Sequence, residues 1–156
     1  MTAASLSHRP IRLAVRAVIV QDDRLLLVNA WPDGKSDLLC APGGGADSHA
    51  ALPDNLAREL HEETGLRISV GQICLVNEFH DPDRDFHQVD IYFWAQITAG
   101  EIDPAWKDPE AIVTDRIWVT KDEMRGLNVK PDSLIDIAFG PQDAPVFYDP
   151  LEPIVR

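Results

Sequence analysis

The sequence predicts an α/β (α+β) fold, in which strands surround one central helix and a second helix follows late in the chain. First, Val-, Ile- and Leu-rich runs at 12–20 and 24–29 are typical of strands. Second, an amphipathic helix is expected over 53–64, before two longer strand-like runs. Third, a helical pattern returns at 131–139. At 156 residues, 45% of them apolar, the chain is expected to bury one core.

Three segments divide the chain by composition. Residues 1–10 are expected to form a loose arm, and residues 11–140 a single domain. Residues 141–156 contain four prolines and no clear periodicity, so they are interpreted as a Pro-rich C-terminal tail.

The charge balance excludes two classes of partner. A net charge of −12 argues against non-specific binding to nucleic acid or to an anionic membrane, both of which need clustered Lys and Arg.

No apolar run approaches the length of about 20 residues that a membrane helix needs. Cys40 and Cys74 lack metal-binding or redox spacing, which favours buried thiols. We therefore expect a cytoplasmic protein with a small-molecule partner.

The first strands are expected at 12–20 and 24–29, joined by a turn at Asp22 and Asp23, as a hairpin or as two neighbouring strands. A short apolar piece at 38–40 then leads into a glycine-rich turn at 43–45.

The central helix has clear signals at both ends. Pro53 suits the first helical position, and Gly65 suits the residue just past the end. Leu56 and Leu60 lie on the apolar face, as helical spacing requires.

The second half of the chain is expected to add strands at 68–78, 86–98 and 115–119, the first two joined by the polar turn 80–85. Polar and apolar residues alternate along 88–93, which favours a half-buried strand. Thr120 and Glu123 have the spacing of a capping box. The final helix, 131–139, is expected to direct Leu134, Ile135 and Ala138 inward.

Three glutamates on the central helix are not placed as solvating charges. Glu59, Glu62 and Glu63 fall within one arc of roughly 100°, and two of them border the apolar face. They also lie in the C-terminal half, where the helix dipole disfavours anions. Arg58 can pair with Glu62 one turn on, which leaves two carboxylates that need a cation. Hard oxygen ligands at this density suit Mg²⁺ or Mn²⁺.

The segment 44–66 resembles the Nudix box, whose pattern is G-x5-E-x7-R-E-U-x-E-E-x-G-U with U a bulky aliphatic residue. Gly44 opens the match, and Arg58-Glu59-Leu60-His61-Glu62-Glu63-Thr64-Gly65-Leu66 completes it. One position departs, because Ala50 stands where the pattern has glutamate. The resemblance extends over roughly 11–139.

Nudix resemblance implies a mixed β-sheet sandwiched between helices and a metal-dependent pyrophosphohydrolase. It implies that Glu59, Glu62 and Glu63 bind the metal and that Arg58 orients them, with Glu62 and Arg58 counted among the catalytic residues. Gly43, Gly44 and Gly45 let the backbone approach the ligand closely, since no Cβ intervenes.

In the family a general base often comes from a loop outside the box. Glu110 is placed for that role, with Asp108 as second choice, although a solvated loop acid is the alternative. Five residues are considered for ligand contacts, namely His80, His87, Trp31, Phe79 and Trp106. For each of them, an ordinary surface or core role is the alternative.

The leading hypothesis is hydrolysis of a nucleoside diphosphate linked to another group. The substrate is either a nucleoside triphosphate, including oxidised ones, or a nucleotide sugar such as ADP-ribose. Family members that act on ADP-ribose often carry a proline some distance past the box, and Pro82 is compatible with that pattern. The alternative is a nucleotide-sensing or interaction domain with little catalysis, for which Ala50 is the support. A homodimer is compatible with exposed strand edges.

Overall fold

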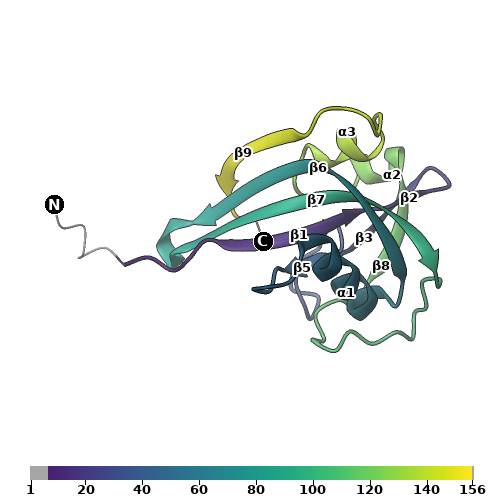
Figure 1. The fold of residues 1–156 in the computed structure, drawn as a ribbon, viewed down its shortest axis with the longest axis horizontal. Coiled ribbons are helices and arrows are strands. Elements are labelled where there is room, and N and C mark those ends of the chain that lie inside the picture. The colour runs from purple at the N-terminus through teal and green to yellow at the C-terminus, as the bar shows by residue number, and fades with distance from the viewer. Residues whose placement is uncertain (1–6, 156) are drawn as a thin grey trace.

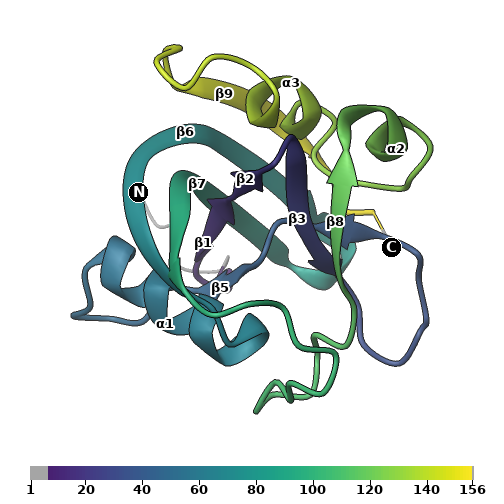
Figure 2. The same ribbon diagram turned by 90° about the vertical axis from the view of Figure 1, so that its right-hand side faces the viewer.

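The structure, a computed structural model, describes residues 7–155 as two β-sheets with helices on both sides (Figures 1 and 2). One sheet has five strands in the order β5-β1-β7-β6-β9, and the other joins β2, β3, β4 and β8. The strands are β1 (Arg12–Val18), β2 (Val20–Gln21), β3 (Arg24–Asn29), β4 (Leu39–Cys40), β5 (Gly43–Gly45), β6 (Arg67–Asp81), β7 (Phe86–Ala99), β8 (Arg116–Thr120) and β9 (Phe147–Pro153). The helices are α1 (Leu52–Thr64), η1 (Pro82–Arg84), α2 (Lys121–Arg125) and α3 (Leu134–Ala138).

The five-stranded sheet is mixed. Strand β1 runs parallel to β7 and antiparallel to β5, and β9 runs parallel to β6. Helix α1 lies on one side of this arrangement, while α2 and α3 lie on the other (Figure 2). Each side has its own core: Leu56 and Leu60 of α1 pack on one, and Leu134 of α3 packs on the other. The predicted mixed sheet between helices is confirmed.

Strands β6 and β7 are the longest and form a hairpin across η1, as expected from the sequence. The alternation along 88–93 predicted a half-buried strand, and burial does alternate there, but the polar face is the more buried one. Gln88, Asp90 and Tyr92 are 1–3% exposed, whereas Val89 and Ile91 are only partly buried. The three more buried side chains face a polar cavity, so the alternation separates a polar interior surface from an apolar one.

Three other predictions differ from the structure. The hairpin expected from 12–29 forms only between β2 and β3, because β1 ends at Val18 and belongs to the other sheet. The glycines at 43–45 form strand β5 rather than a turn. The helix expected over 131–139 is shorter, Leu134–Ala138, although Leu134 and Ala138 are buried as predicted.

The C-terminal tail contains strand β9, which its sequence did not reveal. The domain limits of 11–140 stay a prediction, and the expected arm at 1–10 falls mainly on residues 1–6, outside the described part. Within that part, His8 and Arg9 bind Asp85 beside η1. The capping box of Thr120 and Glu123 is confirmed at α2. No helix among the described residues is long and apolar enough to cross a membrane.

Candidate active site

Helix α1 carries the acidic side chains, and its C-terminal end is held from outside. Gly65 ends the helix with φ +76°, a conformation that glycine adopts without strain. Trp106 packs over Gly65 and donates its Nε1–H to the carbonyl of Glu62 at 2.8 Å. Arg116 Nε donates to the carbonyl of Glu63 at 2.6 Å. These donors satisfy carbonyls that a helix end leaves free, so Trp106 supports the helix. Trp106 is not among the described residues that line the cavity beside this helix.

Two of the glutamates face the glycine strand. Glu59 is 7% exposed, and its carboxylate lies against Gly44, where any side chain would displace it. The N–H of Gly43 donates to Glu63 Oε2 at 3.1 Å. A Cβ on Gly43 would collide with the carbonyl oxygen of Val15 on β1, so glycine is required there. The glycines therefore let β5 lie between β1 and the acidic helix.

Burial raises the pKa of both glutamates. The pKa of Glu63 rises to about 8, because burial disfavours the carboxylate more than Arg16 and the Gly43 N–H stabilise it. Burial also raises the pKa of Glu59, although the charge of Arg58 acts in the opposite direction. Burial thus makes both carboxylates costly to keep charged, and a bound cation would reduce that cost.

Arg58 organises the outer side of the acidic helix. It donates to Glu62 Oε1 at 2.9 Å, and its other nitrogen lies 2.7 Å from Asp47 and 3.3 Å from Glu59. The predicted Arg58–Glu62 pair is confirmed. Asp47 was not expected in this network. It gives Arg58 a further carboxylate partner, whereas Ala50, where the box pattern has glutamate, is exposed and offers none.

A loop between β7 and β8 brings Glu110 to the cavity. The buried carboxylate of Asp108 accepts hydrogen bonds from the backbone N–H groups of Glu110, Ile112 and Val113, at 3.0, 3.2 and 2.9 Å. Asn29, also buried, accepts from the next two N–H groups of the loop at 2.9 Å. The Asp108 carboxylate therefore holds this loop through its hydrogen bonds, whereas Glu110 is exposed and lines the cavity.

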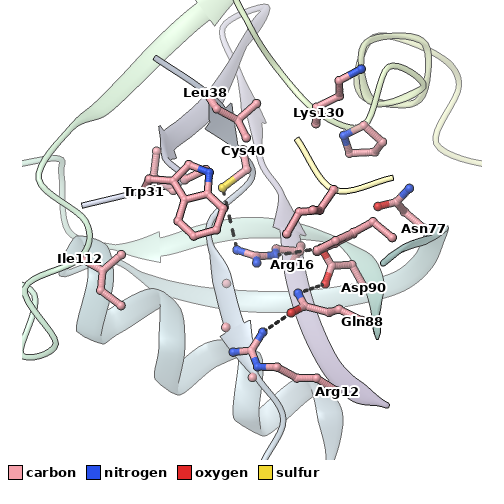
Figure 3. Close-up of a pocket in the computed structure, with 18 of the residues that line it drawn as sticks. Arg12, Arg16, Trp31, Leu38, Cys40, Asn77, Gln88, Asp90, Ile112 and Lys130 are labelled. Carbon is pink, nitrogen blue, oxygen red and sulfur yellow. Dashed lines mark hydrogen bonds and ion pairs between the residues drawn. The ribbon is translucent and has the colours of Figure 1, made fainter. Parts of the chain in front are cut away.

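The cavity has a volume of about 680 Å³. Its acidic wall contains Glu59, Glu63 and Glu110, together with the glycines of β5. Its floor is a row of polar side chains from β1 and β7, running Arg12–Gln88–Asp90–Arg16 (Figure 3). Glu62 is not among the described residues that line this cavity.

Arg16 lies at the centre of the cavity in Figure 3. Its Nε is 3.4 Å from Asp90 Oδ2 but, among the described residues, makes no hydrogen bond. Its Nη1 donates to the carbonyl of Ala41 at 3.3 Å. Arg16 Nε is therefore paired with Asp90 by charge, without a hydrogen bond within the described part of the chain. Sequence reasoning missed it, because nothing in a Val- and Ile-rich strand distinguishes an inward arginine.

The other candidate contacts separate into two groups. Trp31 and Phe79 line the cavity, as a ligand-stacking role would require. His80 and His87 are not among its described lining residues. Instead, His87 Nε2 lies 3.0 Å from Glu78, and the two imidazoles pack with their centroids 6.0 Å apart. The cysteines are free, with Cys74 buried and Cys40 partly buried at the cavity.

In residues 7–155 no three His, Cys, Asp or Glu side chains are already gathered in a geometry that holds a metal ion. The donor chemistry nevertheless fits a hard divalent cation. Glu59 and Glu63 line one wall, and the partly buried Glu63 has no nearby charge strong enough to restore its ordinary pKa. Glu62, which is bound to Arg58, would have to exchange that contact for the ion.

A mixed sheet between helices, with a glycine strand and an acidic helix beside a cavity, defines an α+β domain with a candidate ligand and metal site. The sequence profile of the NUDIX domain matches residues 10–137. The chain therefore belongs to the Nudix family, as the box at 44–66 predicted.

Individual proteins and solved structures are also similar to this chain. An ADP-ribose pyrophosphatase from Methanocaldococcus jannaschii is 29% identical over 92 residues, which cover 58% of this chain and 53% of that protein. The match thus spans about half the length of this curated relative. Among solved structures, a NUDIX hydrolase from Nitrosomonas europaea has 24% identity and a TM-score of 0.68, covering 82% of this chain and 86% of its own. An ADP-ribose pyrophosphatase from Streptococcus suis has 19% identity and a TM-score of 0.66, covering 90% and 100%. The two structures show the fold alone.

Proposed function

We propose that this chain hydrolyses the pyrophosphate bond of a nucleoside diphosphate linked to another moiety. The observation that carries the proposal is one wall of the cavity, where the carboxylates of Glu59 and Glu63 meet the glycine backbone of β5. A wall of this kind suits a phosphate chain only if cations lie between the two, since both are negative. The fold and the family support the same reading.

Divalent cations are the general cofactor of the Nudix family, and Mg²⁺, or Mn²⁺, is our proposal for this chain. Glu59, Glu62 and Glu63 would hold the ion. When bound, it would neutralise the charge of the pyrophosphate and lower the pKa of a water molecule. The chain's own part is to keep these oxygens on one helix face.

The remaining site residues have proposed roles that follow from their positions. Arg58 holds Glu62, Glu59 and Asp47 and so orients the acidic side chains. Glu110 is proposed to take the proton of the attacking water, because it lines the cavity and its charge acts on Glu59. Gly43, Gly44 and Gly45 are proposed to leave room for the phosphates.

Two substrate classes were expected, nucleoside triphosphates and nucleotide sugars. The names of the Methanocaldococcus and Streptococcus relatives favour an ADP-ribose-like compound. The competing role, a nucleotide sensor with weak catalysis, rested on Ala50. The contact of Asp47 with Arg58 reduces its support, because the arginine already has the partner that Ala50 does not provide. A cytoplasmic location and a homodimer stay proposals.

The test is a substrate panel assayed with Mg²⁺ for release of phosphate or nucleoside monophosphate. We expect turnover of ADP-ribose or of a nucleoside triphosphate, and its loss in Glu62→Gln and Glu63→Gln. Glu101→Gln, an exposed position outside the cavity, is the matched control. Metal-dependent nucleotide binding without turnover across the panel would replace the hydrolase by the sensor.

A further inference from the structure

Strand β9 lies beyond residues 10–137, the segment that the family profile matches, yet it forms part of the cavity wall. It pairs with β6, and Ile154 N–H donates to the carbonyl of His80 at 3.0 Å. Glu152, Pro153, Ile154 and Val155 line the cavity. The C-terminal segment thus adds side chains from outside the matched profile to the cavity.

A register shift decides which side chain of β9 enters the cavity. Asn77 of β6 pairs with Asp149, but Phe79, two residues on, pairs with Glu152. Three residues of β9 therefore stand opposite two of β6, which defines a bulge. Side chains alternate along a strand, so without the bulge Leu151 would share the face of Asn77 and Phe79. With it, Glu152 takes that place.

This exchange does not serve stability. Leu151 is 44% exposed, whereas Glu152 is half-buried and lines the cavity. Burying the leucine and exposing the glutamate would give the folded chain a lower free energy. Burial stabilises an apolar side chain, whereas it costs free energy for a charged one. Bulges are common beside active sites, where they redirect a side chain. The bulge of β9 therefore has the character of a functional feature.

The neighbours of Glu152 specify the chemistry of a ligand. Asn77, itself buried, donates to Glu152 Oε1 at 3.2 Å. Asp90 adds a second carboxylate to the floor, where its Oδ2 forms an ion pair with Arg16 Nε at 3.4 Å. Asn77 and Lys130 lie on the opposite side of the cavity from Ile112 in Figure 3. Carboxylates accept hydrogen bonds from hydroxyl and amino groups and repel phosphate.

We propose that Glu152, redirected by the bulge in β9, is a specificity residue that accepts a hydrogen bond from an uncharged hydroxyl- or amino-bearing part of the substrate. That group comes from a sugar or from a nucleobase. The inference rests on the proposed function, because it assumes that phosphates occupy the glycine wall. It adds a residue from outside the matched family segment to the recognition of the substrate.

The test measures binding of four probes to the full chain by calorimetry in the presence of Mg²⁺: AMP, GMP, ribose 5-phosphate and inorganic phosphate. We expect Glu152→Ala to weaken nucleotide binding about tenfold or more, and to leave phosphate binding unchanged. Glu152→Gln, which keeps one acceptor oxygen, is expected to lose less. Equal losses for ribose 5-phosphate and AMP identify a sugar hydroxyl, whereas a loss confined to the nucleotides identifies the base.

Leu151→Ala is the control, because it alters the same strand on its exposed side. Unchanged nucleotide affinity in Glu152→Ala overturns the proposal, and so does an equal loss for inorganic phosphate, which would mean general damage to the cavity. If wild-type chain turns over a substrate of the panel while Glu152→Ala binds every probe normally, only this inference fails. If wild-type chain binds none of the probes and turns over nothing, the proposed function fails with it.

Discussion

At the scale of single residues, Asp47 explains how the box tolerates Ala50. Its carboxylate lies 2.7 Å from Arg58, on the turn that also contains Ala50. The sequence showed Asp47 close to position 50 but not at it. Chain folding brings the carboxylate back to Arg58, which spacing along the sequence cannot show.

We therefore predict that Asp47→Ala lowers kcat/KM roughly tenfold, because loss of groups that orient ligand side chains often costs about 10- to 100-fold. Stability should change little, since the pair is largely exposed and such pairs contribute about 1 kcal/mol or less. The measurement is steady-state kinetics beside a urea melt. Adding Ala50→Glu to this variant should recover activity, and a full-rate Asp47→Ala would show that Arg58 needs no partner there.

Asp108 offers a second prediction at this scale. Three backbone N–H groups depend on its two oxygens, and an unsatisfied buried donor costs about 1–3 kcal/mol. Asp108→Asn replaces one oxygen with a donor and should displace the Glu110 loop. We expect kcat to fall with little change in metal binding.

Glu110→Gln tests the same loop directly and should lower kcat strongly while metal binding is retained. If Asp108 acts through Glu110, the double variant should be no slower than Glu110→Gln alone. Additive losses in kcat would mean that Asp108 and Glu110 act independently. An unaltered kcat in Glu110→Gln would end its assignment as the general base.

At the scale of elements, the sequence predicted best where local signals suffice. The acidic helix, the β6–β7 hairpin and the capping box of α2 follow from periodicity and end signals. Strands β5 and β9 escaped prediction because their partners are distant in sequence. Gly43–Gly45 has no side chains to form a pattern, and its strand exists only through pairing with β1.

The C-terminal end of α1 gives the prediction for this scale. A Cβ at Gly65 would lie 2.8 Å from the Trp106 ring, and φ there is +76°. Gly65→Ala should therefore lower the free energy of unfolding by more than the roughly 1 kcal/mol expected from backbone strain alone. Urea denaturation measures it.

Gly34→Ala is the matched control, because φ is +63° there and no atom lies within 4 Å of the added Cβ. The difference between the two variants reports the contact of Trp106 with the helix end. Equal losses would mean that Trp106 moves aside at no cost.

At the scale of the whole molecule, the fold and the acidic wall were predictable, but the cavity was not. Apart from Glu110, the wall comes from one contiguous stretch of the chain, residues 43–63, so its spacing specifies it. The floor joins Arg16 on β1 to Asp90 on β7, and β9 adds Glu152 from near the C-terminus. Such a surface exists only after parallel strands from distant segments have paired, and no local pattern encodes it.

The net charge of −12 supplies the final prediction, because it allows general screening to be separated from a specific ion site. Added NaCl should raise Tm by screening self-repulsion. MgCl₂ at the same ionic strength should raise it further, since a ligand that binds only the folded state stabilises it by RT ln(1 + [L]/Kd). At ten times Kd this is about 1.4 kcal/mol, or roughly 3–6 °C.

Glu63→Gln separates the two contributions. The variant should keep the response to NaCl and lose the additional response to Mg²⁺, whatever its own starting Tm. Glu101→Gln removes the same charge from an exposed position and should keep both responses. If wild-type chain gains no more from Mg²⁺ than from NaCl in thermal melts, the acidic wall holds no ion before the substrate arrives. Metal and nucleotide would then have to bind together, since Glu59 and Glu63 alone would not compensate for the loss of the ion's hydration.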